Sequence, residues 1–147
     1  MAQGDAPQRY TLKRDVTLGS REGNAEGSVP FNRQYGQLTA AQKDVVRSSY
    51  VALGDSDEPP FPLDGLGALY GPITKGQQQL LVSGEFRADA EIDAEGNVIS
   101  IAVLQSPSAQ VTKFVANILV LTRFKSARCL GQPCAMGFPV RVTFKVG

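Results

Sequence analysis

Two cysteines, Cys129 and Cys134, are the residues whose type and spacing most directly suggest chemistry. Between them lie Gly131 and Pro133, which favour a chain reversal that would bring the two thiols together. A single close pair favours a disulfide, and hence an oxidising compartment, over free thiols. Zinc would need further ligands, and a thioredoxin-type redox pair has a shorter spacing at a helix start. We therefore expect a structural disulfide that contributes about 2 kcal/mol of stability.

Acid–base catalysis has few candidate residues in this chain. Histidine, the commonest catalytic acid or base, is absent. The carboxylates of segment 85–95 alternate with apolar residues, which predicts a solvated face rather than a desolvated pocket. Gly65, Gly67 and Gly71 do not have the spacing of a phosphate-binding loop. We expect no catalytic residues and no cofactor, and therefore a protein that is not an enzyme.

An acidic, proline-stiffened connector over residues 55–62 raises the question of calcium, which prefers carboxylate oxygens. The spacing lacks the central glycine turn and the distal glutamate of an EF-hand loop. Carboxylates are also common near the start of a helix, where they complement its dipole. We expect no metal site among these carboxylates, which are Asp55, Asp57, Glu58 and Asp64.

The clearest structural pattern is the strict alternation of charged and apolar residues over 85–95. Successive side chains of a strand point to opposite faces, so this period predicts a strand over 84–93 with one apolar and one solvated face. Gly96 is expected to supply the positive φ angle of a hairpin turn. A second strand, over 98–105, has apolar residues on both faces, so we expect both to be partly covered.

A helix separates this hairpin from the last strand. Ser106 is its expected N-cap residue and Pro107 its first helical position, since proline is favoured there. From Val111 onward, apolar residues recur at helical spacing. The segment 138–146 returns to a period of two and predicts the third strand.

Two helices are expected before the hairpin. Thr39 and Gln42 have the form of a capping box, which predicts a helix from Thr39 to about Leu53. A second helix is expected over 64–82, with Pro72 kinking it or splitting it in two.

The composition fits one small domain with an N-terminal extension. Residues 1–36 are rich in Gly, Asn, Ser and Gln, and we expect them to form a flexible or loosely structured arm. Hydrophobic residues make up 42% of the chain, enough for one core. We expect a single α+β domain over 37–147, with a β-β-α-β core over 84–147.

Chain direction predicts the order of the three strands. The helix returns the chain, so in an all-antiparallel sheet the third strand lies beside the first, giving the order 2-1-3 with helices packed on one face. Acidic residues of the first strand opposite Arg141 and Lys145 of the third support this order. The third strand is then an edge that can accept an extended peptide. Its expected binding residues are Val140, Arg141, Val142, Thr143, Phe144 and Lys145.

Charge limits the class of partner. The net charge of +1 argues against a nucleic-acid binder. After Glu95 the chain has no acidic residue but keeps six basic ones, so its C-terminal third favours an acidic or extended peptide partner; the alternative is a solvated basic face. No apolar run approaches the length of about 18 residues that a membrane span needs. We expect a protein or peptide partner and no membrane span.

Several short motifs follow one another over the last part of the chain. They are the turn Asp93–Val98, the step Ser106–Pro107, the segment Phe124–Ala127, and Gly131–Pro133 followed by Val140–Phe144. Taken in order, these motifs resemble the C-terminal domain of the energy transducer TonB and its relatives. The resemblance covers about Gly84 to Gly147 and implies a periplasmic domain whose last strand pairs with a short segment of an outer-membrane receptor or similar protein.

The chain also departs from that family. The membrane anchor and the long proline-rich spacer of TonB are missing, Ser126 stands where the family typically has Pro, and the cysteine pair is not a general feature. No secretion signal is present at residues 1–5, and we expect that one has been removed. We expect a free-standing periplasmic module. The alternative is a structural domain whose edge forms a homodimer or is covered by the N-terminal arm.

Overall fold

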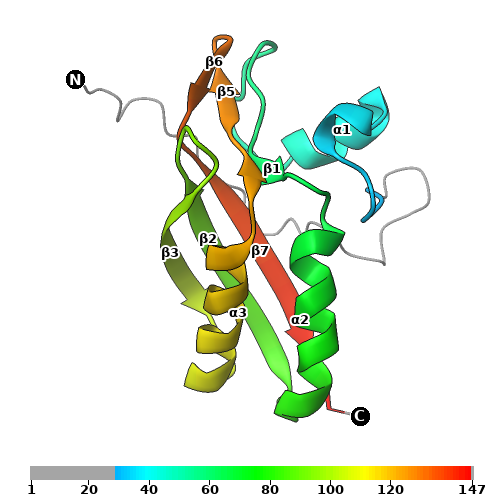
Figure 1. Ribbon diagram of the computed structural model, residues 1–147, viewed down its shortest axis with the longest axis vertical. Helices are drawn as coiled ribbons and strands as arrows, with labels where there is room; N and C mark the ends of the chain where they lie inside the picture. Colours follow the sequence, from blue (N-terminus) through cyan, green and yellow to red (C-terminus); the bar gives the residue numbers. More distant parts are fainter. Residues whose placement is uncertain (1–28, 147) are drawn as a thin grey trace.

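Three antiparallel strands form the central sheet of the protein, which a computed structural model describes for residues 29–146 (Figure 1). The strands are β2 (Gly84–Ile92), β3 (Val98–Gln105) and β7 (Met136–Phe144), and their order is β3-β2-β7. The predicted α+β class and the predicted strand order are both confirmed. Predictions for residues 1–28 lie outside the described residues.

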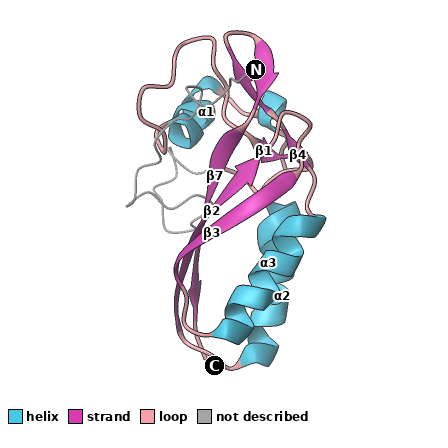
Figure 2. Cartoon of the chain, turned by 90° about the vertical axis from the view of Figure 1, so that its left-hand side faces the viewer, coloured by secondary structure: helices cyan, strands magenta, loops and turns pink. Residues whose placement is uncertain are grey.

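Two helices, α2 (Gly67–Leu80) and α3 (Ala109–Leu121), cover one face of this sheet (Figure 2). The alternation of charged and apolar residues over β2 matches the burial of its side chains: every second side chain from Phe86 to Ile92 is buried, and those between are not. The helices contribute the other side of the core, with Leu69, Tyr70, Ile73, Val111, Val115 and Leu119.

Helix α3 begins later than the sequence predicted. Its N-cap is Ser108, whose hydroxyl accepts a hydrogen bond from the Val111 N–H at 3.1 Å. Ser106 donates to the Ser108 carbonyl instead, at 2.9 Å. Pro107 is not the first helical residue, because it packs against the sheet: a Cβ on Gly84 would lie 2.8 Å from the Pro107 Cβ atom.

Helix α1 (Ala40–Arg47) has the predicted start but a different end. Both hydrogen bonds of the capping box are present, at 3.1 Å to the Thr39 hydroxyl and 2.9 Å to the Gln42 side chain. The helix stops at Arg47 rather than near Leu53. The Arg47 guanidinium reaches past the helix end and donates to the Gly54 carbonyl at 2.7 Å, so the following residues turn back instead of continuing the helix.

Helix α2 is one helix, so of the two effects expected of Pro72, a kink or a split, the split does not occur. Pro72 lies on an exposed side of the helix. The neighbouring stripe of the helix, with Leu69 and Ile73, is fully buried against the core. Packing of this apolar stripe compensates for the backbone hydrogen bond that proline removes.

Short elements complete the domain at one end of the sheet. The pair β1 (Phe61–Pro62) and β4 (Phe124–Lys125) and the hairpin of β5 (Ala127–Cys129) and β6 (Gln132–Cys134) are antiparallel ribbons. The 3-10 helix η2 (Tyr35–Gln37) buries Tyr35, and Val29 and Phe31 also pack against the core. The packed domain therefore begins before residue 37. Over residues 29–146, no helix is long and apolar enough to cross a membrane.

Candidate functional site: the edges of the sheet

Strand β7 is an edge strand of the three-stranded sheet, as the sequence predicted. It pairs with β2 from Gly84 opposite Phe144 to Ile92 opposite Met136. Among the described residues, no strand pairs with its other side. The predicted binding residues Val140–Phe144 lie in this strand, and Lys145 follows it.

The middle of β7 is covered on both faces. Phe138 and Val140 point into the core and are fully buried, and Pro139 and Arg141, which point the other way, are buried as well. Arg141, one of the predicted binding residues, is therefore not open to solvent, since only 8% of it is exposed. A period of two reports the face to which a side chain points and not what lies over that face.

The main chain of β7 is also occupied along its first half. The Tyr50 hydroxyl donates to the Gly137 carbonyl at 2.7 Å. The Asp93 N–H bonds to Asn97 on the β3 side, so by alternation Glu91 also faces β3, and Gly137, which lies opposite Glu91, points its polar groups away from β2. Alternate residues of a strand share that direction, so Pro139, Arg141 and Thr143 also point theirs outward. Pro139 has no N–H to donate, and an edge strand tolerates proline at such an outward-facing position. A strand arriving at this edge would find main-chain groups free only near Thr143.

Two tyrosines, Tyr50 and Tyr70, lie beside this covered edge, and both are buried. Burial raises the pKa of Tyr50 well above its ordinary value, and the nearby Asp89 carboxylate raises it further. Burial also raises the pKa of Tyr70, an effect that the Arg141 main chain partly offsets. No hydrogen bond of standard geometry to a described residue satisfies the Tyr70 hydroxyl. Ionisation of either hydroxyl therefore opposes folding.

Because the pKa values of these tyrosines are raised, we expect the protein to lose stability at high pH. Above pH 10.0, their ordinary pKa, tyrosines of the unfolded chain lose protons that the folded chain keeps, so the free energy of unfolding falls as pH rises. The variant Tyr50→Phe should cost about 1 kcal/mol near pH 7, because the Gly137 hydrogen bond is lost. It should then lose less stability than the wild type as pH rises further. Urea denaturation across this range measures both effects, and equal slopes for the two proteins would contradict the assignment.

Strand β3 forms the opposite edge of the sheet, and it is open. It pairs only with β2 among the described residues. Its eight residues carry no charge, and Ile99, Val103 and Leu104 are 58%, 41% and 42% exposed. Only Val98 and Ile101 pack against the core. The expectation that both faces of this strand are partly covered is therefore wrong for most of its length.

The regular part of β3 is its centre, from Ser100 to Val103. Irregularities in the pairing with β2 leave Ile99 and Leu104 without a partner on β2. Between them, Ala102 pairs with Asp89. On its other side Asp89 lies opposite Pro139, whose main-chain groups point away from β2, so the main-chain groups of Asp89 face β3.

It follows that Ile101 and Val103 direct their main-chain N–H and C=O groups away from the sheet. Sequence reasoning missed this edge. The signal that could have revealed it is a run of eight uncharged residues in a strand, without the lysine or proline that usually protects an edge.

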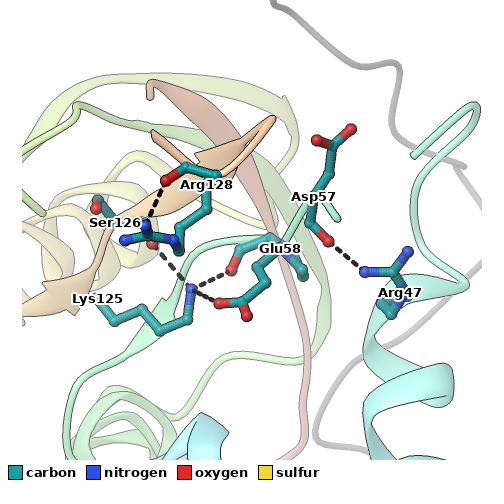
Figure 3. Close-up of polar contacts among 8 residues, drawn as sticks. Arg47, Asp57, Glu58, Lys125, Ser126 and Arg128 are labelled. Atoms are coloured by element: carbon teal, nitrogen blue, oxygen red, sulfur yellow. Dashed lines mark hydrogen bonds and ion pairs between the residues drawn. The ribbon is translucent and has the colours of Figure 1, made fainter. Parts of the chain in front are cut away.

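Lys125, in the connection between α3 and the disulfide hairpin, is a highly constrained charged side chain (Figure 3). Its ammonium group donates to the carbonyls of Pro59 at 3.1 Å and Ser126 at 2.9 Å, and lies 3.2 Å from a Glu58 carboxylate oxygen. Burial lowers the pKa of Lys125, and Glu58 opposes that effect. The three donors of the ammonium group are thus matched by three acceptors. This lysine holds the connector to β4.

The disulfide prediction is confirmed: Cys129 and Cys134 are joined across the β5–β6 hairpin. The hairpin turn is anchored by Asp57, which is only 3% exposed. One Asp57 oxygen accepts from the Leu130 N–H at 2.8 Å and the other from the Gly54 N–H at 3.0 Å. The acidic connector therefore serves to hold the hairpin. Within 29–146, no group of three or more His, Cys, Asp or Glu residues could hold a metal ion.

A shallow groove of about 390 Å³ lies between the start of α2 and the end of α3. Leu121 on its wall is 82% exposed, the most exposed large apolar residue described. The groove contains no pair of side chains suited to acid–base work. Its lining residues are Asp64, Ala68, Pro72, Ile118, Leu121, Thr122 and Arg123.

Comparison with protein-family models and with curated proteins found no match in either set. The function is therefore argued from the geometry of the sheet edges.

Proposed function

We propose that this domain is a protein-interaction module that binds an extended segment by adding it as a strand to the sheet. The observation that carries the proposal is the open edge of β3, uncharged and exposed, with the main-chain groups of Ile101 and Val103 directed outward. Main-chain hydrogen bonds give such binding its affinity, and alternate side chains give it specificity.

The geometry favours β3 over β7 as the accepting edge. At β7, Tyr50 occupies the Gly137 carbonyl and Pro139 offers no donor. At β3, the exposed apolar side chains beside the free main-chain groups add buried apolar area when a partner strand pairs there. A partner that adds to β3 should therefore be extended and largely uncharged.

A periplasmic location and a TonB-like role are the finer part of the proposal. The disulfide supports an oxidising compartment. The strand order β3-β2-β7 is the one that chain direction predicted for the segment that the resemblance covers. That resemblance implies a receptor segment added to the last strand, whereas the cover over β7 favours addition at β3. The module is proposed to bind and not to catalyse, in keeping with the fully engaged ammonium group of Lys125.

A peptide titration followed by NMR tests this function. The probe is an extended peptide of alternating valine and threonine with lysines at both ends, added to dilute protein. We expect amide shifts and slower hydrogen exchange at Ile101 and Val103, because a new strand would accept their N–H groups. A peptide of the same sequence, N-methylated at every second residue on the pairing edge, should have no effect. Shifts confined to Thr143 and its neighbours, or none at all, would contradict the proposal.

A further inference from the structure

We infer that the strand that β3 accepts is the β3 strand of a second copy of this chain, so that two sheets join into one continuous antiparallel sheet. This inference rests on the proposed function and names its partner. The two copies would be related by a twofold axis that crosses the middle of β3.

Charge is the first argument for an identical partner. In a twofold interface, β3 of one copy pairs with β3 of the other. Any charged residue on β3 would therefore lie near the same residue of the second copy, and the two like charges would repel each other. Charged residues make up 20% of the chain, yet β3 has none over eight residues. The strand thus avoids the repulsion that usually prevents self-pairing. For the same reason it offers no charge with which to select an unlike partner.

The register of the pairing follows from the outward-facing residues. Because Ile101 and Val103 direct their main-chain groups outward, each must form a hydrogen-bonded pair with an outward-facing residue of the other copy. If Ile101 pairs with Val103 of the second copy, both the N–H and the C=O group of each residue form a hydrogen bond. This register sets two β-branched side chains opposite each other on the helix-covered face, a favourable cross-strand combination.

The same register places Ala102 opposite Ala102 of the second copy, on the twofold axis. The regularly paired segment from Ser100 to Val103 then lies within the interface between the two copies, and the irregular residues Ile99 and Leu104 lie at its ends. The small side chain on the axis leaves room for the two strands to approach.

Sedimentation velocity of the full chain over a range of concentrations tests the dimer. We expect a monomer–dimer equilibrium that Val103→Lys weakens by at least about tenfold, since the edge then gains a desolvated charge. The matched control Val103→Thr keeps a β-branched, uncharged side chain and should dimerise as the wild type does. Leu121→Lys removes the most exposed large apolar residue of the described part of the chain, which lies outside β3, and should also leave the equilibrium unchanged. Circular dichroism checks that each variant is folded.

A designed cross-link tests the register without depending on those variants. In Ala102→Cys the two new cysteines would face each other in a non-hydrogen-bonded pair, with Cα atoms about 4.5 Å apart, within the range of a disulfide. Mild oxidation should give a covalent dimer on a non-reducing gel, and Ser56→Cys, an exposed position in the connector, should give none.

The outcomes separate this inference from the function on which it rests. A monomer at every concentration, with no cross-link at position 102, would overturn the β3 dimer. If the valine–threonine peptide still shifts Ile101 and Val103, strand addition stands and the partner is another protein. A dimer lost in Leu121→Lys but kept in Val103→Lys would place the interface on the helix groove and overturn the inference. Loss of both the dimer and peptide binding would overturn the inference and the function together.

Discussion

Replacing Gly96 by alanine is expected to lower the free energy of unfolding by at least about 3 kcal/mol. Gly96 has a φ angle of +88° in the turn between β2 and β3. A Cβ atom there would lie 2.1 Å from the Phe124 carbonyl oxygen, and backbone cannot move aside as a flexible side chain can. The clash would also disturb the hydrogen bond from the Phe124 N–H to the Gly96 carbonyl, at 3.2 Å. Urea denaturation of the variant measures the loss.

A second glycine provides the matched control. Gly131, in the disulfide hairpin, has a similar φ angle of +83°, but nothing lies within 4 Å of its Cβ position. Gly131→Ala should therefore cost only the backbone strain, about 1 kcal/mol. The difference between the two variants isolates the contact with Phe124. Equal losses would mean that the positive φ angle accounts for the whole effect and that the close approach is unimportant.

Replacing Asp57 by alanine is expected to lower the free energy of unfolding by about 2–4 kcal/mol. Its carboxylate is buried and accepts from the main-chain N–H groups of Gly54 and Leu130. Both main-chain donors would lose their acceptor, and the space that the buried carboxylate fills would be left empty. The connector next to Asp57 pairs with β5 through Glu58 and Arg128, at 2.8 and 2.9 Å, so the loss should extend to the hairpin. Denaturation with urea gives the size of the effect, and hydrogen exchange at Leu130 shows where it acts.

Its control is Asp55, an exposed carboxylate of the same connector. Asp55→Ala should change stability by less than about 0.5 kcal/mol, as surface substitutions usually do. The variant Asp57→Asn keeps one acceptor oxygen and should fall between the two. If Asp55→Ala and Asp57→Ala had equal effects, overall acidity of the connector would matter and the anchoring contacts would not.

The two edges of the sheet differ in how they are protected. The edge at β7 is protected by means known from natural sheets, namely a proline at an outward-facing position and cover over its side chains. Within residues 29–146, the edge at β3 has only local irregularities at Ile99 and Leu104. We propose that association occurs at the β3 side of the sheet, opposite the side that the sequence alone suggested.

Local sequence patterns determined most of the secondary structure. The alternation over β2, the hairpin glycine at 96 and the capping box at Thr39 each depend on neighbouring residues, so their signals are complete in the sequence. The strand order followed from chain direction once the hairpin and the helix were recognised. The spacing of Cys129 and Cys134 likewise sufficed to predict their disulfide.

Tertiary structure alone decided which edge is open. Tyr50 reaches the Gly137 carbonyl across 87 positions of sequence, and no period of two records such a contact. The burial of Arg141, the approach of Gly96 to Phe124 and the continuity of α2 through Pro72 have the same origin. A pattern gives the direction of each side chain along one element. What covers that element is set by segments distant in sequence, and only their packing determines it.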